Sequence, residues 1–74
     1  MLIRINDDII NLALVTLIRK RKHNDAVSVI EFTYPDSTVT EYYFSTGDAE
    51  ALWEKIWKRI SETDHHLKFE SKEL

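Results

Sequence analysis

The sequence predicts an α+β domain: a three- to four-stranded antiparallel meander with one C-terminal amphipathic helix packed on one face. Three observations lead to this prediction. Residues 46–62 have apolar side chains at helical spacing, residues 26–34 and 38–44 are rich in strand-forming residues, and short turn sequences separate the strands. A length of 74 residues is that of one domain, which we place at residues 1–63.

The segment Thr46–Glu62 is the clearest predicted element. Its apolar residues fall within an arc of about 140° on a helical wheel, and charged residues occupy the opposite side. Either Ser45 or Thr46 can accept a hydrogen bond from the first free N–H groups of the helix. Trp53 lies nearer the centre of the apolar stripe and Trp57 lies at its edge. We therefore expect Trp53 in the core and Trp57 partly exposed.

The first part of the chain is less regular. Residues 2–6 alternate between apolar and polar and predict a short strand. Asn6 is a suitable helix cap, and acidic residues follow it, so we expect a short helical turn over residues 7–11. Residues 9–22 fit either a helix or a strand. We favour a strand from about residue 14 to 22, because the segment is rich in β-branched residues.

Two further strands are predicted with less ambiguity, at residues 26–34 and 38–44. The turn between them contains Pro35, and the turn before them is His23-Asn24-Asp25. Residues 64–74 are polar. They are predicted to be either a disordered tail or a short edge strand through Leu67 and Phe69.

The sheet is expected to have apolar residues on both faces, although one helix covers only one face. Ile30 and Phe32 share the face that the helix covers. An uncovered apolar face often marks an interface, but β-branched residues on a solvent-facing sheet are also simply good strand formers. The predicted interface residues are Val27, Val29, Val39 and Tyr43 on the uncovered face, and Trp57 at the rim of the helix.

A basic run, Arg19-Lys20-Arg21-Lys22, is the strongest charge feature. It predicts, as an alternative, binding to nucleic acid or to an acidic surface. On a strand, however, neighbouring side chains point to opposite faces, so no single face would hold all four cations. The net charge of −3 and the isoelectric point near 5.5 also disfavour nucleic acid as the main partner.

No pattern typical of an enzyme is present. There is no cysteine, and the single glycine excludes a glycine-rich phosphate loop. The three histidines, His23, His65 and His66, are expected in solvated loops, and the acidic pair Asp7-Asp8 is better explained by the helix dipole than by acid–base chemistry. We therefore expect a non-enzymatic protein with no cofactor and no metal.

The remaining expectations concern partners and location. The N-terminus lacks the apolar core of a signal peptide, and no apolar run is long enough to span a membrane. A cytoplasmic location and no membrane partner are expected. A core of this size is only marginally sufficient, so association with another protein or with a second copy is the favoured function.

Three short stretches carry a loose resemblance to a known group: Ile5-Asn6, Val15-Thr16-Leu17-Ile18 and Asp48-Ala49-Glu50-Ala51-Leu52-Trp53. Their order resembles that of small bacterial meander-plus-helix proteins of unknown function. The resemblance covers roughly residues 2–62 and leaves out the basic run and the tail. It implies the same fold, and it implies no activity, cofactor or binding residue.

Overall fold

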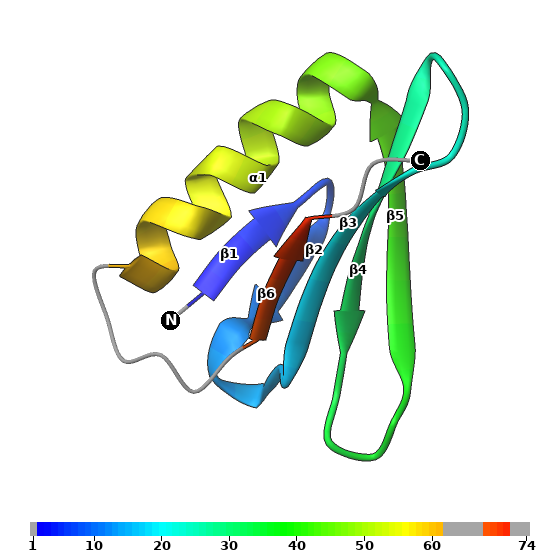
Figure 1. Cartoon of the computed structure of the whole chain (residues 1–74). Helices are drawn as coiled ribbons and strands as arrows, with labels where there is room; N and C mark the ends of the chain where they lie inside the picture. The colour runs from blue at the N-terminus through cyan, green and yellow to red at the C-terminus, as the bar shows by residue number, and fades with distance from the viewer. Residues whose placement is uncertain (1, 62–67, 72–74) are drawn as a thin grey trace.

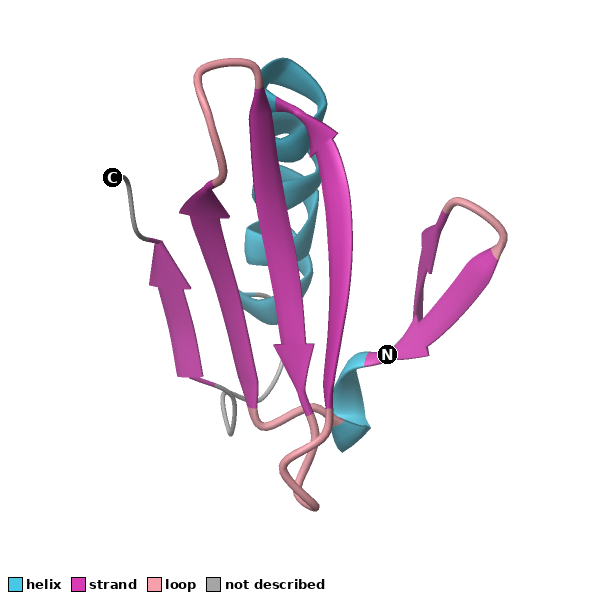
Figure 2. Cartoon of the chain, turned by 90° about the vertical axis from the view of Figure 1, so that its right-hand side faces the viewer, coloured by secondary structure: helices cyan, strands magenta, loops and turns pink. Residues whose placement is uncertain are grey.

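The fold was determined as a computed structural model, which describes residues 2–61 and 68–71. It is an α+β fold, as predicted. Strands β3 (Leu17–Lys22), β4 (Val27–Thr33) and β5 (Val39–Ser45) form an antiparallel meander, and helix α1 (Thr46–Ser61) lies across one face of it (Figure 1). Figure 2 shows the opposite face of this sheet, with the helix behind it.

A fourth strand extends the sheet on the side of β3. Strand β6 (Lys68–Ser71) pairs parallel with β3, so the strand order is β5-β4-β3-β6. This confirms the edge-strand alternative for residues 68–71, although the parallel direction departs from a purely antiparallel meander. Residues 64–67 and 72–74 of the predicted tail lie outside the described residues.

The N-terminal segment is a separate β-hairpin, made of β1 (Leu2–Ile5) and β2 (Asp8–Asn11). The helical turn predicted over residues 7–11 is therefore wrong, and Asn6 does not cap a helix. Asn6 instead adopts a φ of 55° in the two-residue turn, a conformation that asparagine tolerates better than most residues. The turn pairs Ile3 with Ile10, and both side chains are buried. Burial of this pair favours the hairpin over a helical turn.

The ambiguity at residues 9–22 is also resolved. A short 3₁₀ helix, η1 (Leu12–Leu14), follows β2, and the side chain of Asn11 accepts a hydrogen bond from the Ala13 N–H at 3.1 Å. The predicted strand is confirmed, but it begins at Leu17 rather than near residue 14. The three-residue helix occupies the space in which the chain turns from the hairpin into the sheet.

Hydrogen bonds among the described residues attach the hairpin to the sheet and to the helix. The Tyr42 hydroxyl on β5 donates to the Asp8 carboxylate at 2.8 Å, and the Arg59 guanidinium on α1 donates to the Leu2 carbonyl at 2.9 Å. The hairpin lies on the helix side of the main sheet (Figure 1). Its isoleucines therefore join the same core as α1 and the sheet.

The core lies between the sheet, the hairpin and α1. Ile18, Ile30 and Phe32 of the sheet pack with residues of the helix stripe, and each large apolar side chain contributes about 1.5–3 kcal/mol on burial. Trp53 is 7% exposed and Trp57 is 49% exposed, which confirms the expected order of the two tryptophans. The Ser45 hydroxyl accepts from the Asp48 N–H at 3.3 Å, so Ser45 is the residue that caps the helix.

Candidate interaction surface

We call the side of β3, β4 and β5 that faces away from α1 the open face. Of the predicted interface residues on it, Val39 and Tyr43 are each 52% exposed and Val27 is partly buried. Val29 has no exposed area, so the expectation that it lacks cover within the chain is wrong. It lies in the central strand between Arg21 and Tyr43, whose longer side chains shield it. Trp57 lies on α1, on the other side of the sheet.

A network of charges crosses the open face from β3 to β5. The Arg21 guanidinium donates to Glu31 on β4 at 3.1 Å and to Glu41 on β5 at 3.1 Å. The hydrogen bond to Glu31, with that to Glu41, raises the pKa of Arg21 above its ordinary value. Next to this network, the His23 ring meets the Tyr43 ring edge-on, with centroids 5.2 Å apart. The exposed Tyr43 side chain therefore has a fixed neighbour on one side.

The free edge of the sheet at β5 adjoins this face. Two backbone bonds, from Tyr34 N–H to the Thr38 carbonyl and from Thr46 N–H to the Ala26 carbonyl, mark the two ends of the β4–β5 ladder. Because hydrogen-bonded pairs alternate along an antiparallel ladder, these bonds decide which β5 residues bond to β4. The residues whose backbone groups point inward to β4 are Thr40, Tyr42 and Phe44. Those whose groups point outward are Val39, Glu41, Tyr43 and Ser45.

Strand β5 itself lacks the usual sequence features that prevent strand pairing, although the β1–β2 hairpin lies beyond this edge of the sheet (Figure 2). Strand β5 contains no proline and no lysine, and its register with β4 is unbroken over all seven residues. Its only charged residue is Glu41, whose carboxylate is already paired with Arg21. Within residues 2–61 and 68–71, no backbone hydrogen bond links the outward groups of β5 to another element. The edge is therefore a regular row of donors and acceptors open to a further strand.

The strand alternation predicted that the four cations of the basic run would not share one face, and the structure agrees. Arg21 points to the open face, whereas Lys20 points to the helix side and forms an ion pair with Glu50. The Lys22 ammonium lies 3.6 Å from the Asp25 carboxylate. Lys20, Arg21 and Lys22 thus each have an acidic partner among the described residues. Nucleic-acid or acidic-surface binding through Arg19 and these three residues stays a prediction, tested by a gel shift at low salt.

The residues considered for catalysis or metal binding are dispersed. His23 is in the β3–β4 loop, Asp7 is in the exposed hairpin turn, and Asp8 accepts a hydrogen bond from Tyr42. Burial, with the bond to Asp8, raises the pKa of Tyr42 to about 12. In the described part of the chain no three His, Cys, Asp or Glu side chains are placed to hold a metal ion. His65 and His66 lie outside the described residues.

Some of this surface could have been found from the sequence and was missed. A meander followed by a helix leaves its last strand at one edge of the sheet, so β5 was the natural candidate. No signal in the sequence points to the pairing of Lys20 with Glu50, which are thirty residues apart.

Comparisons with known proteins add no further information. No protein-family model matches the chain, and no curated protein and no solved structure gives a significant match. Among the described residues there is no helix with the length and hydrophobicity needed to span a membrane.

Proposed function

We propose that this protein is a small, non-enzymatic interaction module that pairs with a second copy through the β5 edge and the adjoining part of the open face. The observation that carries the proposal is the unprotected, seven-residue edge of β5. An exposed regular edge is a template for pairing with another strand. Joining two such edges would extend the sheet across both copies.

The side chains beside the edge favour the same surface. Val39 and Tyr43 are exposed on β5, next to the outward backbone groups. A second strand would remove part of their apolar area from water, and tyrosine is enriched at interface centres. Trp57 belongs to a different side of the molecule, so it is not part of the proposed interface.

A second copy is the partner that this edge fits best, because one antiparallel register is self-complementary. Placing Glu41 opposite Tyr43 of the second copy, and Val39 opposite Ser45, brings all four outward residues of each strand into hydrogen-bonded pairs. A register centred on Glu41 would instead place two carboxylates opposite each other, and like charges directly opposite are destabilising. The charge on Glu41 thus disfavours the register centred on Glu41.

The proposal is tested by sedimentation velocity on the wild-type protein and on Glu41→Pro. The Glu41 N–H points outward, so proline removes no bond to β4 but does remove a donor from the edge. Glu41→Ala is the matched control, since it also loses the contact with Arg21 and keeps the N–H. We expect dimers for the wild type and Glu41→Ala, and a folded monomer for Glu41→Pro. A wild-type protein that stays monomeric at several hundred micromolar would refute the proposal.

The location remains a prediction. We propose a cytoplasmic protein without a membrane partner, on the basis of the sequence features described above.

A further inference from the structure

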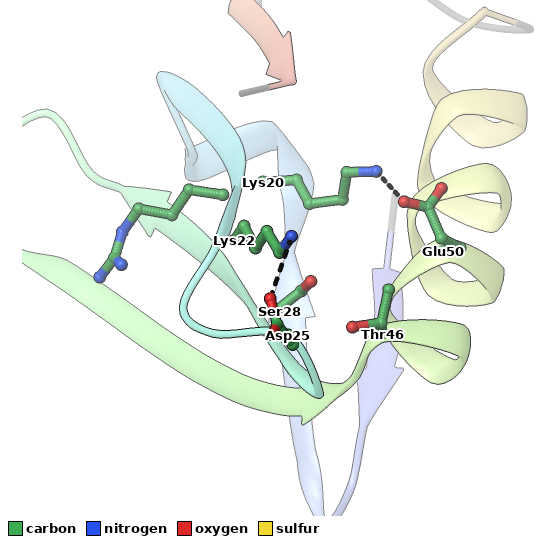
Figure 3. Close-up of a pocket in the computed structure, with 7 residues that line it drawn as sticks. Lys20, Lys22, Asp25, Ser28, Thr46 and Glu50 are labelled. Carbon is green, nitrogen blue, oxygen red and sulfur yellow. Dashed lines mark hydrogen bonds and ion pairs between the residues drawn. The ribbon is translucent and has the colours of Figure 1, made fainter. Parts of the chain in front are cut away.

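A polar pocket lies mainly on the helix side of the sheet, and Arg21 of β3 is also among the residues that line it. It is a cavity of about 150 Å³ between β3, the β3–β4 loop and the start of α1. In Figure 3 one side is formed by the Lys20–Glu50 ion pair and another by Lys22 and Asp25, with Ser28 and Thr46 beside them. None of these residues is needed for the proposed pairing of β5.

Ser28 is the first sign that the pocket is built for a ligand. It lies on β4, is only 6% exposed, and lines the cavity. Its hydroxyl forms no hydrogen bond with any residue in the described ranges. The Ser28 oxygen is not among the fully buried unpartnered atoms, so it is reached from the cavity and is free to bond to a molecule there.

Two more donors share the cavity. The Thr46 hydroxyl, at the start of α1, belongs to an exposed residue and has no hydrogen-bond partner within residues 2–61 and 68–71, so it is available to a ligand in the cavity. Among the described residues the Lys22 ammonium is paired with the Asp25 carboxylate at 3.6 Å, and the Asp25 side chain is fully exposed. Two hydroxyls and the Lys22 ammonium therefore line the same space, together with the Asp25 and Glu50 carboxylates, and the positive end of a sixteen-residue helix adjoins them.

We propose that this pocket binds a small tetrahedral oxyanion of the phosphate type. Such an ion presents acceptors in several directions, which suits donors that come from β3, β4 and α1. A carboxylate has only two oxygens in one plane and fits this arrangement less well. The inference does not rest on the proposed dimer.

The two acidic residues of the pocket, Glu50 and Asp25, have different effects on an incoming anion. Glu50 has its charge paired with Lys20, which is itself 6% exposed, so this carboxylate is held by a buried cation. Asp25 has no such restraint and competes with an incoming anion for Lys22. Removing the charge of Asp25 should therefore strengthen oxyanion binding, whereas a merely structural role for these residues predicts no such gain.

The test is a titration of the full chain with inorganic phosphate at constant ionic strength, followed by amide NMR signals of Ser28, Thr46 and Gly47. We expect saturable shifts for the wild type, about tenfold or more weaker binding for Lys22→Met and Ser28→Ala, and tighter binding for Asp25→Asn. Lys58→Met, at the far end of α1, is the control for loss of one positive charge and should bind as the wild type does.

Two further ligands identify the source of the oxyanion. O-phosphoserine that saturates the same signals more tightly than inorganic phosphate would assign the pocket to phosphomonoesters, whereas tighter inorganic phosphate would assign it to the free ion. Acetate should bind more weakly than either. Linear, non-saturating shifts with phosphate, or equal binding by Lys22→Met and Lys58→Met, would overturn the inference.

Discussion

Replacing Glu50 with alanine should destabilise the protein far more than replacing its partner Lys20 with methionine. The two side chains form one ion pair, but their surroundings differ. The Lys20 side chain is 6% exposed and the Glu50 side chain is 48% exposed. Glu50→Ala leaves a buried ammonium without its carboxylate, whereas Lys20→Met leaves a carboxylate that water can solvate.

The size of the difference follows from these surroundings. Breaking a buried pair by removing one partner costs about 3–5 kcal/mol. The Lys20 ammonium keeps the Trp53 ring, whose centroid is 5.7 Å away, and such a contact is worth about 0.5–1 kcal/mol. The Glu50 side chain is 48% exposed, so the pair is only partly buried, and we expect Glu50→Ala to lower the free energy of unfolding by about 2–3 kcal/mol, near or below the low end of the range for a buried pair. Lys20→Met retains the buried stem and should stay within about 1 kcal/mol of the wild type.

Thermal and urea unfolding measure both effects. For a domain of this length, 2–3 kcal/mol corresponds to a decrease in Tm of roughly 10–20 °C. Glu54→Ala, at an exposed position on the same helix, is the control for removing a helix carboxylate and should change little. Equal destabilisation by Glu50→Ala and Lys20→Met would refute the reasoning, because it would mean that the burial of Lys20 does not matter.

Two other predictions concern β5. The pKa of Tyr42, raised to about 12, means that the folded state holds this proton more tightly, so the associated stability is complete below about pH 10 and is lost as the pH rises through 12. Urea unfolding at a series of pH values measures this loss of stability, and Tyr42→Phe should remove the part that is due to Tyr42. The same decrease of unfolding free energy with rising pH in Tyr42→Phe and in the wild type would contradict the prediction. The chain has no cysteine of its own, so the double variant Glu41→Cys, Tyr43→Cys should oxidise to a covalent dimer. Efficient cross-linking of Glu41→Cys alone would indicate a different register.

The main elements could be predicted because each satisfies a local rule. The apolar stripe of α1 places Trp53 and Ile56 in the core, and the alternation along β4 does the same for Ile30 and Phe32. The cap was predicted at Ser45 or Thr46, and the structure places it at Ser45. In these segments local preference and tertiary packing agree.

The errors arose where distant contacts decide the structure. Asp7 and Asp8 suit the start of a helix as well as a hairpin turn, and the choice depends on burying Ile3 against Ile10. Alternation likewise assigns Val29 to the open face but does not show that neighbouring long side chains shield it. The exposure of a side chain depends on its neighbours on the adjacent strands, and the sequence pattern of one strand does not identify those neighbours.

The polar pocket also depends on contacts between residues that are distant in the sequence. Lys20 and Ser28 belong to different strands, and α1 supplies Glu50 and Thr46 only once it is packed on the sheet. A sequence pattern can place each residue on a face. It does not bring the donors of three separate elements around one cavity.

The most direct test of the pairing of β5 with a second copy is backbone amide hydrogen exchange measured as a function of protein concentration. The Thr40, Tyr42 and Phe44 amides bond to β4 and should be protected at every concentration. The amides that point outward should become protected only as the concentration rises into the range of the dimer: Val39, Glu41, Tyr43 and Ser45. If these four amides exchange rapidly at all concentrations, the edge is unpaired and the proposed association through β5 is wrong.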